Sequence, residues 1–269
     1  MHVDAVSYPR PEGPNEDFEL CDATAAVVLD GAGMAPGMKS GCQHGVAWYV
    51  EQLGTRLHEA ARGDASLAAC LATAIDATTD LHRDTCVVDG PLSPSATVSM
   101  ARVRGDAFEW LVLGDCTALI ESNGVVTAMT DDRLAQVAPH AREALARAVP
   151  ESPERHRAHE TLVQEERSQR NVRGGYWVAA ADPTAASQAL TGSERTSRVQ
   201  GVALLTDGAG RLVTTFGSTD WPGYMTLLKH GGPEAVLRQV REAEASDPDL
   251  SRWPRSKQHD DATIAYVRP

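Results

Sequence analysis

Acidic residues stand at the ends of several apolar runs in this sequence. Ala25–Leu29 leads directly into Asp30, and two further runs lead into Asp115 and Asp207. Runs of Val, Leu and Ala bounded by glycine are typical of buried strands, so these acids are expected at strand ends. Crowded carboxylates repel one another unless a cation lies among them, and Mg²⁺ and Mn²⁺ prefer such oxygen ligands. The pattern therefore predicts a site for hard divalent cations at the edge of a sheet.

Each acid taken singly has an ordinary explanation. The pair Asp30-Gly31 alone is better explained as a turn after a strand, because Asp and Gly are common turn residues. The pattern recurs, however: Asp207-Gly208 repeats it, and Asp260-Asp261 directly precedes another apolar run. This recurrence favours a shared site over separate turns. No Ser-His-Asp or Cys-His arrangement and no G-x-S-x-G motif offers a competing nucleophile. A metal site thus accounts for the pattern better than four unrelated turns.

The net charge and the distribution of apolar residues argue against several classes of protein. A formal net charge of -12 argues against nucleic acid or an anionic membrane as partner. The first residues lack the basic and then apolar pattern of a signal peptide, and no apolar run is long enough to span a bilayer. With 42% hydrophobic residues and no linker-like stretch, residues 1–269 are expected to form a single domain. We expect a cytoplasmic monomer.

The cysteines predict free thiols. There is no Cys-x-x-Cys pair and the total is odd, which fits a reducing compartment better than a disulfide frame or a zinc site. His44 is expected on the surface of the first predicted helix. The five cysteines are Cys21, Cys42, Cys70, Cys86 and Cys116.

The hydrophobic periodicity predicts an α+β sandwich of antiparallel sheets with helices outside. Helices are predicted from a stripe over Val46–Leu57 and from a cap at Ser66, and a run of hairpins over Ala96–Met129, where Asn123-Gly124 is a strong turn signal. The highly charged stretch Pro150–Gly174 is predicted to be a solvated segment over the surface. Further strands are expected at Val3–Ser7, Gly175–Ala180, Val199–Thr206 and Ala262–Val267, and further helices at Asp132–Ala148, Tyr224–Lys229 and Pro233–Ala245.

The order of the motifs resembles that of a known family, the PPM or type 2C metal-dependent protein serine/threonine phosphatases of bacterial type. The resemblance covers nearly the whole chain and implies a four-layer α-β-β-α sandwich with two central, mostly antiparallel sheets. It implies a signalling enzyme whose substrate is a phosphorylated protein. The segments that carry it are Asn15-Glu16-Asp17, Val28–Gly33, Ser95-Ala96-Thr97, Leu113-Gly114-Asp115, Leu205–Gly208 and Asp260–Thr263.

The resemblance implies roles for the strand-end acids. Asp30 would bridge two Mn²⁺ or Mg²⁺ ions, and Gly31 would provide its carbonyl oxygen. Asp207 and Asp260 would complete the shell of one metal, and with Asp30 they would be the catalytic residues. The implied reaction is hydrolysis of phosphoserine or phosphothreonine by water that the dinuclear centre activates, because two cations lower the pKa of water between them.

The remaining acids have weaker implied roles. Glu16, together with Asp17, would act through metal-bound water. Asp115 matches the acid that in bacterial members helps to hold a third, weaker metal. All the implied metal-binding acids are therefore present in the sequence.

Three positions depart from the family pattern. Ala32 stands where a His usually donates a proton to the leaving alkoxide, a loss that typically costs on the order of 100-fold in rate. Glu12 stands where an Arg usually grips the phosphate, and Asp261 replaces the usual Asn. Either the prolines bend the chain so that Arg10 binds phosphate, or phosphate is bound weakly. A weak or inactive pseudophosphatase that binds metal and a phosphorylated partner is therefore the alternative to an enzyme.

Overall fold

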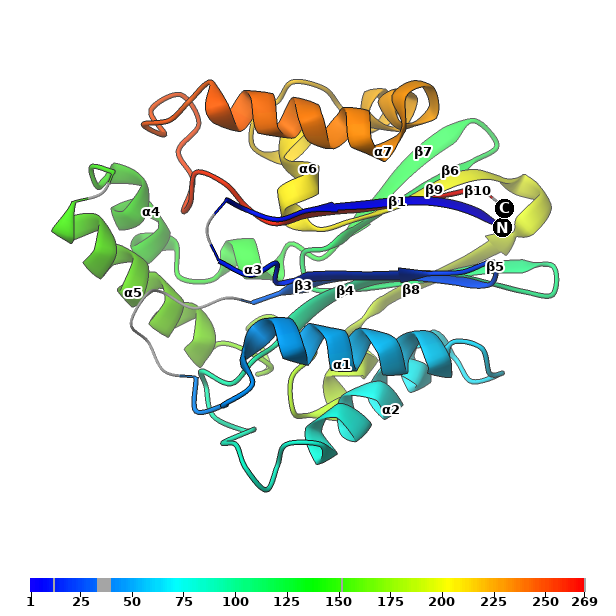
Figure 1. The fold of residues 1–269 in the computed structure, drawn as a ribbon, viewed down its shortest axis with the longest axis horizontal. Helices are drawn as coiled ribbons and strands as arrows, with labels where there is room; N and C mark the ends of the chain where they lie inside the picture. The colour runs from blue at the N-terminus through cyan, green and yellow to red at the C-terminus, as the bar shows by residue number, and fades with distance from the viewer. Residues whose placement is uncertain (12, 33–39, 151, 269) are drawn as a thin grey trace.

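The computed structural model describes residues 1–11, 13–32, 40–150 and 152–268, and the elements lie in clear layers (Figure 1). The strands are β1 (His2–Tyr8), β2 (Asp17–Cys21), β3 (Ala25–Gly31), β4 (Ala96–Arg104), β5 (Ala107–Leu113), β6 (Thr117–Ser122), β7 (Val125–Thr130), β8 (Leu190–Arg195), β9 (Val199–Leu205) and β10 (Ala262–Arg268). The α-helices are α1 (Gly45–Ala60), α2 (Leu67–Asp80), α3 (Arg133–Gln136), α4 (Pro139–Arg147), α5 (Pro153–Ser168), α6 (Asp207–Thr214) and α7 (Trp221–Ala245).

The strands form two five-stranded sheets that face each other. One has the order β1-β10-β9-β6-β7 and the other β2-β3-β4-β5-β8, with every neighbouring pair antiparallel. Helices α6 and α7 cover the first sheet, and α1 and α2 cover the second (Figure 1). The predicted α-β-β-α sandwich is confirmed. Strands β1 and β10, from the two ends of the chain, pair along their whole length at one sheet edge.

Burial on both faces explains the apolar runs of the sequence. Residues Ala25–Leu29 of β3 are all fully buried. Because side chains alternate between the faces of a strand, Val27 and Leu29 pack against α1, whereas Ala26 and Val28 pack in the layer between the sheets. A strand that contacts apolar layers on both sides has no solvent-facing position, so its sequence does not alternate.

The predicted helix over Asp132–Ala148 is wrong, because two helices occupy this stretch. Ala138 adopts a left-handed conformation with φ 53° between α3 and α4. Pro139 follows it, and proline disfavours helical geometry at the residue before it. The proline therefore ends one helix and begins the next.

The charged segment Pro150–Gly174, predicted to be solvated, contains α5, most of whose side chains are exposed. Ser152 caps this helix by accepting a hydrogen bond from the backbone N–H of Arg155. Leu162 is buried against Leu145 of α4. Only Leu162, Val163 and Arg167 of this helix are buried, so its composition gave no sign that it docks against α4.

Three smaller differences concern segments near the sheet edges. The expected strand at Gly175–Ala180 makes only isolated bridges, such as Ala96 with Ala179. Edge strand β8 was not predicted, because most of its side chains are exposed. Helix α6, which begins at Asp207, was not predicted. The two late helices are confirmed as the halves of α7, which bends at Gly232.

Among the described helices, none combines the length and apolar character needed to cross a bilayer.

A buried arginine joins the second sheet to the connection between α1 and α2. Arg102 of β4 is only 1% exposed. Its guanidinium donates to Glu109 Oε2 at 2.7 Å and to the carbonyl oxygens of Ala61, Gly63 and Ala65 at 3.1, 3.0 and 2.6 Å. Arg104 also pairs with Glu109, but its side chain is 45% exposed.

We expect Arg102→Leu to lower the free energy of unfolding by about 2–3 kcal/mol, because it removes the donor to Glu109 Oε2 and to three carbonyl oxygens of the α1–α2 connection. Arg104→Leu removes an exposed partner of the same carboxylate and should cost less than about 1 kcal/mol. Urea unfolding of both variants measures the difference. If both variants lost the same free energy of unfolding, the buried contacts of Arg102 would contribute nothing to stability.

Candidate metal centre

Acids from distant parts of the chain meet at one end of the two sheets. Asp30 ends β3 and lies directly opposite Asp17 of β2 in the antiparallel register. Asp207 begins α6 immediately after β9, and Asp260 lies two residues before β10. Strands β9 and β10 are neighbours, so their ends bring the second pair together. The acids predicted from the sequence therefore converge, although they are spread over more than two hundred residues.

A cavity of about 950 Å³ opens at this convergence. Helices α4 and α5 lie beside this end of the sheets (Figure 1). Helix α4 supplies Arg142 to the cavity wall, and α5 supplies His156, His159 and Glu166. Asp17 and Asp260 are buried next to it and do not line it. The residues predicted from the sequence that line the cavity are Arg10, Glu16, Asp30, Gly31, Asp115 and Asp207.

The carboxylates are close enough to change one another's protonation. Burial, followed by repulsion from Asp207, raises the pKa of Asp115 to about 7. The same two causes raise the pKa of Asp260 to about 6, although Lys257 and Arg211 oppose the shift. Burial and four neighbouring acids, first among them Asp207, raise the pKa of Asp30 well above its ordinary value. A cation among these groups would relieve the repulsion.

Asp17 has one satisfied and one unsatisfied oxygen. Its Oδ2 accepts hydrogen bonds from Thr206 Oγ1 at 2.9 Å and Thr263 Oγ1 at 2.7 Å. Its Oδ1 is buried and has no hydrogen-bond partner among the described residues. An unpaired buried carboxylate oxygen is costly, so it calls for a metal or an ordered water. The donors around it are all oxygens, which fits Mg²⁺ or Mn²⁺.

Two glycines permit this close approach. A Cβ on Gly208 would lie 2.0 Å from the carbonyl oxygen of Asp261, so only glycine lets α6 start against the acids before β10. Gly114 adopts φ +78°, in the turn that delivers Asp115 from β5, and a Cβ there would lie 2.5 Å from Thr97 Cγ2. Packing therefore requires the glycine next to Asp207 and the glycine next to Asp115.

Two basic residues that the sequence did not single out pair with Asp260. Arg211 donates to Asp260 Oδ2 at 2.8 Å and to Glu244 Oε1 at 2.6 Å. The ammonium group of Lys257 pairs with Asp260 Oδ1. Burial alone would lower the pKa of Lys257, but Asp260, Asp207 and other acids raise it. A metal that used Asp260 would have to compete with Lys257, and single basic residues outside a motif carry no sequence signal for such a role.

Arg10 lies at the wall of the cavity. Its backbone N–H donates to Asp261 Oδ1 at 2.8 Å, and its guanidinium pairs with Asp261 Oδ2 and donates to Glu16 Oε2 at 3.1 Å. Asp261 also accepts from the backbone N–H of Glu16 at 3.1 Å. The unusual Asp261 thus holds the displaced arginine. Glu12 and Gly33 lie outside the described residues.

Helix α5 is attached to the residue that follows the Asp30-Gly31 pair. Arg167 is buried and donates to the carbonyl oxygen of Ala32 at 2.9 Å and to Ser95 Oγ at 3.0 Å. His259, which the sequence left undecided between the site and solvent, lines the cavity and lies 3.0 Å from Glu244 Oε2. The charged segment is therefore part of the site.

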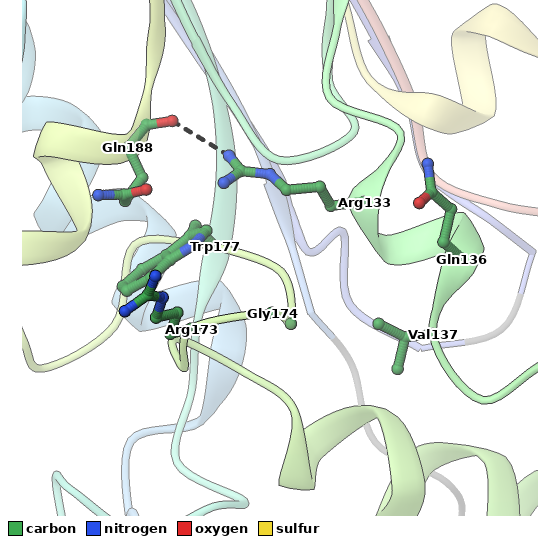
Figure 2. A pocket seen from close by; sticks show the side chains of 8 residues that line it. Arg133, Gln136, Val137, Arg173, Gly174, Trp177 and Gln188 are labelled. Carbon is green, nitrogen blue, oxygen red and sulfur yellow. Dashed lines mark hydrogen bonds between the residues drawn. The ribbon is translucent and has the colours of Figure 1, made fainter.

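Figure 2 shows a second pocket, of about 640 Å³, lined by residues of α3, by Arg173 and Trp177, and by Gln188. Arg133 donates to the carbonyl oxygen of Gln188 at 3.1 Å across it. None of the residues predicted for the site lines this pocket. The acid-lined cavity is therefore the candidate site.

The family model described as "Protein phosphatase 2C" matches residues 15–228. This range includes every acid of the cavity wall and stops before Asp260. A search of curated proteins returns no match.

Solved structures resemble the chain over almost its whole length. The catalytic domain of the serine/threonine phosphatase PstP, in complex with two manganese ions, is 14% identical, with a TM-score of 0.56 over 99% of this chain and 97% of that chain. Stp1 from Staphylococcus aureus is 13% identical, with a TM-score of 0.59 over 100% and 95%. PppA from Pseudomonas aeruginosa, described as a regulatory component of T6SS, is 17% identical, with a TM-score of 0.53 over 100% and 98%. At these identities the likeness shows the fold.

We expect the crowding of Asp115 to appear as a pH-dependent effect on stability. Its folded-state pKa of about 7 lies above the ordinary value of 3.8, so its contribution to stability falls as pH rises between these values. In the presence of a chelator, Asp115→Asn should have little effect on the melting temperature near about pH 4, close to the ordinary pKa of the carboxyl group. Near about pH 8 it should raise the melting temperature by on the order of 5 °C.

Calorimetry across this pH interval measures the shift. Asp64→Asn, an exposed control, should follow the wild type throughout. Saturating Mn²⁺ should raise the melting temperature of the wild type and remove the advantage of Asn. Destabilisation by Asp115→Asn that is equal at both pH values would contradict the crowding.

Proposed function

The chain belongs to the protein phosphatase 2C family of serine/threonine phosphatases, and from this premise we propose that it hydrolyses phosphoserine and phosphothreonine in protein substrates with the help of bound metal ions. The observation that carries the proposal is the convergence of Asp30, Asp115 and Asp207 on one cavity, with Asp17 and Asp260 buried beside them. The raised pKa values of Asp30, Asp115 and Asp260 support a site for cations.

We assign two metal ions to Asp30, Asp207, Asp260 and the carbonyl oxygen of Gly31. A bound Mn²⁺ or Mg²⁺ pair lowers the pKa of water and neutralises phosphoryl oxygens. The oxygen-only donor set and the unpaired Asp17 Oδ1 support this choice of metal.

The outlying acids would serve the same ions indirectly. We assign Glu16 and Asp17 to ordered water at the metals and Asp115 to a third, weaker metal position. Asp17 is suited to such a role because Thr206 and Thr263 hold its other oxygen in place.

Arg10 is our candidate for binding the phosphate. Asp261 and Glu16 hold its guanidinium at the cavity wall. An arginine fixed in this way loses little conformational freedom when it binds a dianion, and its planar group suits phosphate geometry. Asp261 would then be a positioning residue for the substrate, acting through Arg10.

The lack of a proton donor at Ala32 should make the rate depend on the leaving group. An aryl phosphate needs little protonation of its leaving group, whereas a phosphothreonine peptide needs full protonation. With Mn²⁺ present, we expect kcat for p-nitrophenyl phosphate to exceed kcat for the peptide by on the order of 100-fold. Ala32→His should raise the peptide rate by about 10-fold or more and barely change the aryl rate.

Initial rates with both substrates test this, and Asp30→Asn should reduce both by about 100- to 1000-fold. The exposed variant Asp64→Asn is the matched control. If Mn²⁺ raises the melting temperature but neither substrate is hydrolysed, the chain is a metal-binding pseudophosphatase and the proposed activity is wrong. Equal stimulation of both substrates by Ala32→His would refute the role given to position 32.

We expect Arg10→Ala to raise KM for the phosphopeptide by about 10- to 100-fold, the cost of losing charged hydrogen bonds to phosphate. Arg133→Ala removes an arginine from the second pocket (Figure 2) and should leave KM unchanged. Steady-state kinetics of the two variants provide the comparison. A raised KM in Arg133→Ala together with an unchanged KM in Arg10→Ala would place the phosphate in the second pocket.

A further inference from the structure

Two cysteines and two histidines meet where α1 begins and α2 has ended. Cys42 and His44 directly precede α1, and His82 and Cys86 follow α2. One nitrogen or sulfur atom from each of the four side chains lies within 4.8 Å of the others. The two pairs are about forty positions apart in sequence, so the packing of α1 against α2 brings them together.

The distances match the edges of a tetrahedral metal shell. Cys42 Sγ lies 3.5 Å from His82 Nδ1 and 3.8 Å from His44 Nδ1, and Cys86 Sγ lies 3.6 Å from His44 Nδ1. With zinc bonds of about 2.3 Å to sulfur and about 2.0–2.1 Å to nitrogen, tetrahedral angles place adjacent sulfur and nitrogen ligands about 3.5–3.6 Å apart. These three sulfur–nitrogen distances therefore lie close to those of a zinc site, and all four donors lie within 4.8 Å of one another.

The surroundings hold the donors in place. The ring of His44 stacks on Trp48 with centroids 4.1 Å apart, and Trp48 also contacts the edge of His82 at 5.2 Å. The backbone N–H of Gln43 donates to Cys86 Sγ at 3.4 Å, a contact that favours a thiolate. His82 is buried, at 4% exposure. Outer contacts of this kind orient the ligands of metal sites.

We propose that Cys42, His44, His82 and Cys86 bind a structural zinc ion that joins the start of α1 to the end of α2. Four protein ligands complete a tetrahedral shell and leave no position for substrate, so the ion stabilises the fold and takes no part in the chemistry. None of the four residues lines the acid cavity. The sulfur and nitrogen donors select zinc, whereas the oxygens of the cavity select Mg²⁺ or Mn²⁺.

The cysteines are free thiols, as predicted, but the proposed site departs from the expectation that they form no zinc site. Zinc sites are ordinarily signalled by Cys-x-x-Cys pairs, and here the spacings are Cys42-x-His44 and His82-x₃-Cys86. A disulfide between Cys42 and Cys86 is the competing use of the two thiols. It would leave the convergence of both histidines unexplained, and both cysteines are free thiols in the structure.

Zinc content and cobalt spectra test the proposal. The wild type, purified in reductant without chelator, should contain about one equivalent of zinc by elemental analysis. The Co²⁺-substituted chain should show a thiolate-to-cobalt charge-transfer band and the visible bands of tetrahedral cobalt. Cobalt in an all-oxygen site has no thiolate band, so Asp30→Asn should leave that band unchanged.

Variants separate this cluster from the other thiols. Cys42→Ser with Cys86→Ser should lower the zinc content by at least about 10-fold and abolish the thiolate band, whereas Cys21→Ser should keep both. The wild-type spectra decide the matter even if the double variant does not fold. Reduced wild type with no thiolate band, a Cys42–Cys86 disulfide found by thiol titration and mass, or loss of the band in Asp30→Asn would overturn the proposal.

Discussion

Repulsion among buried carboxylates is the constraint on which the active end of this molecule depends. Asp17, Asp30 and Asp260 are held at the ends of strands whose apolar layers are closely packed, so they cannot move apart. The fold offsets part of the repulsion with its own cations, Arg211 and Lys257. What remains appears as raised pKa values, and it is the source of affinity for a bound cation.

The departures from the family pattern form a connected set. Arg10 occupies the cavity wall because Asp261 binds both its backbone and its guanidinium, so two unusual residues explain each other. Ala32 has no proton to donate, but its carbonyl oxygen anchors Arg167 and with it helix α5. Residues that depart from the family motif therefore make specific contacts in the structure. The family comparison supports a phosphatase whose site departs from the usual pattern.

The same sandwich brings together two groups of candidate metal ligands with opposite chemical character. Oxygen donors gather where strand ends meet, whereas sulfur and imidazole donors gather where α1 and α2 meet. Hard and soft ligands discriminate between cations even when both kinds are available. The separation would allow a zinc ion bound by the second set to stabilise the helical layer on the second sheet without entering the proposed chemistry at the sheet edge.

The sequence by itself determined most of the buried strands, the hairpins, the capped helix α2 and the identity of the strand-end acids. Each of these depends on local patterns, such as an apolar run buried on both faces or a Ser before a helical stripe. Only the tertiary structure decided that Arg10 enters the cavity, that Arg211 and Lys257 pair with Asp260, that α5 attaches at Ala32, and that two cysteines and two histidines meet. These contacts join residues far apart in the chain, and their energies depend on distance and burial, which no local periodicity records.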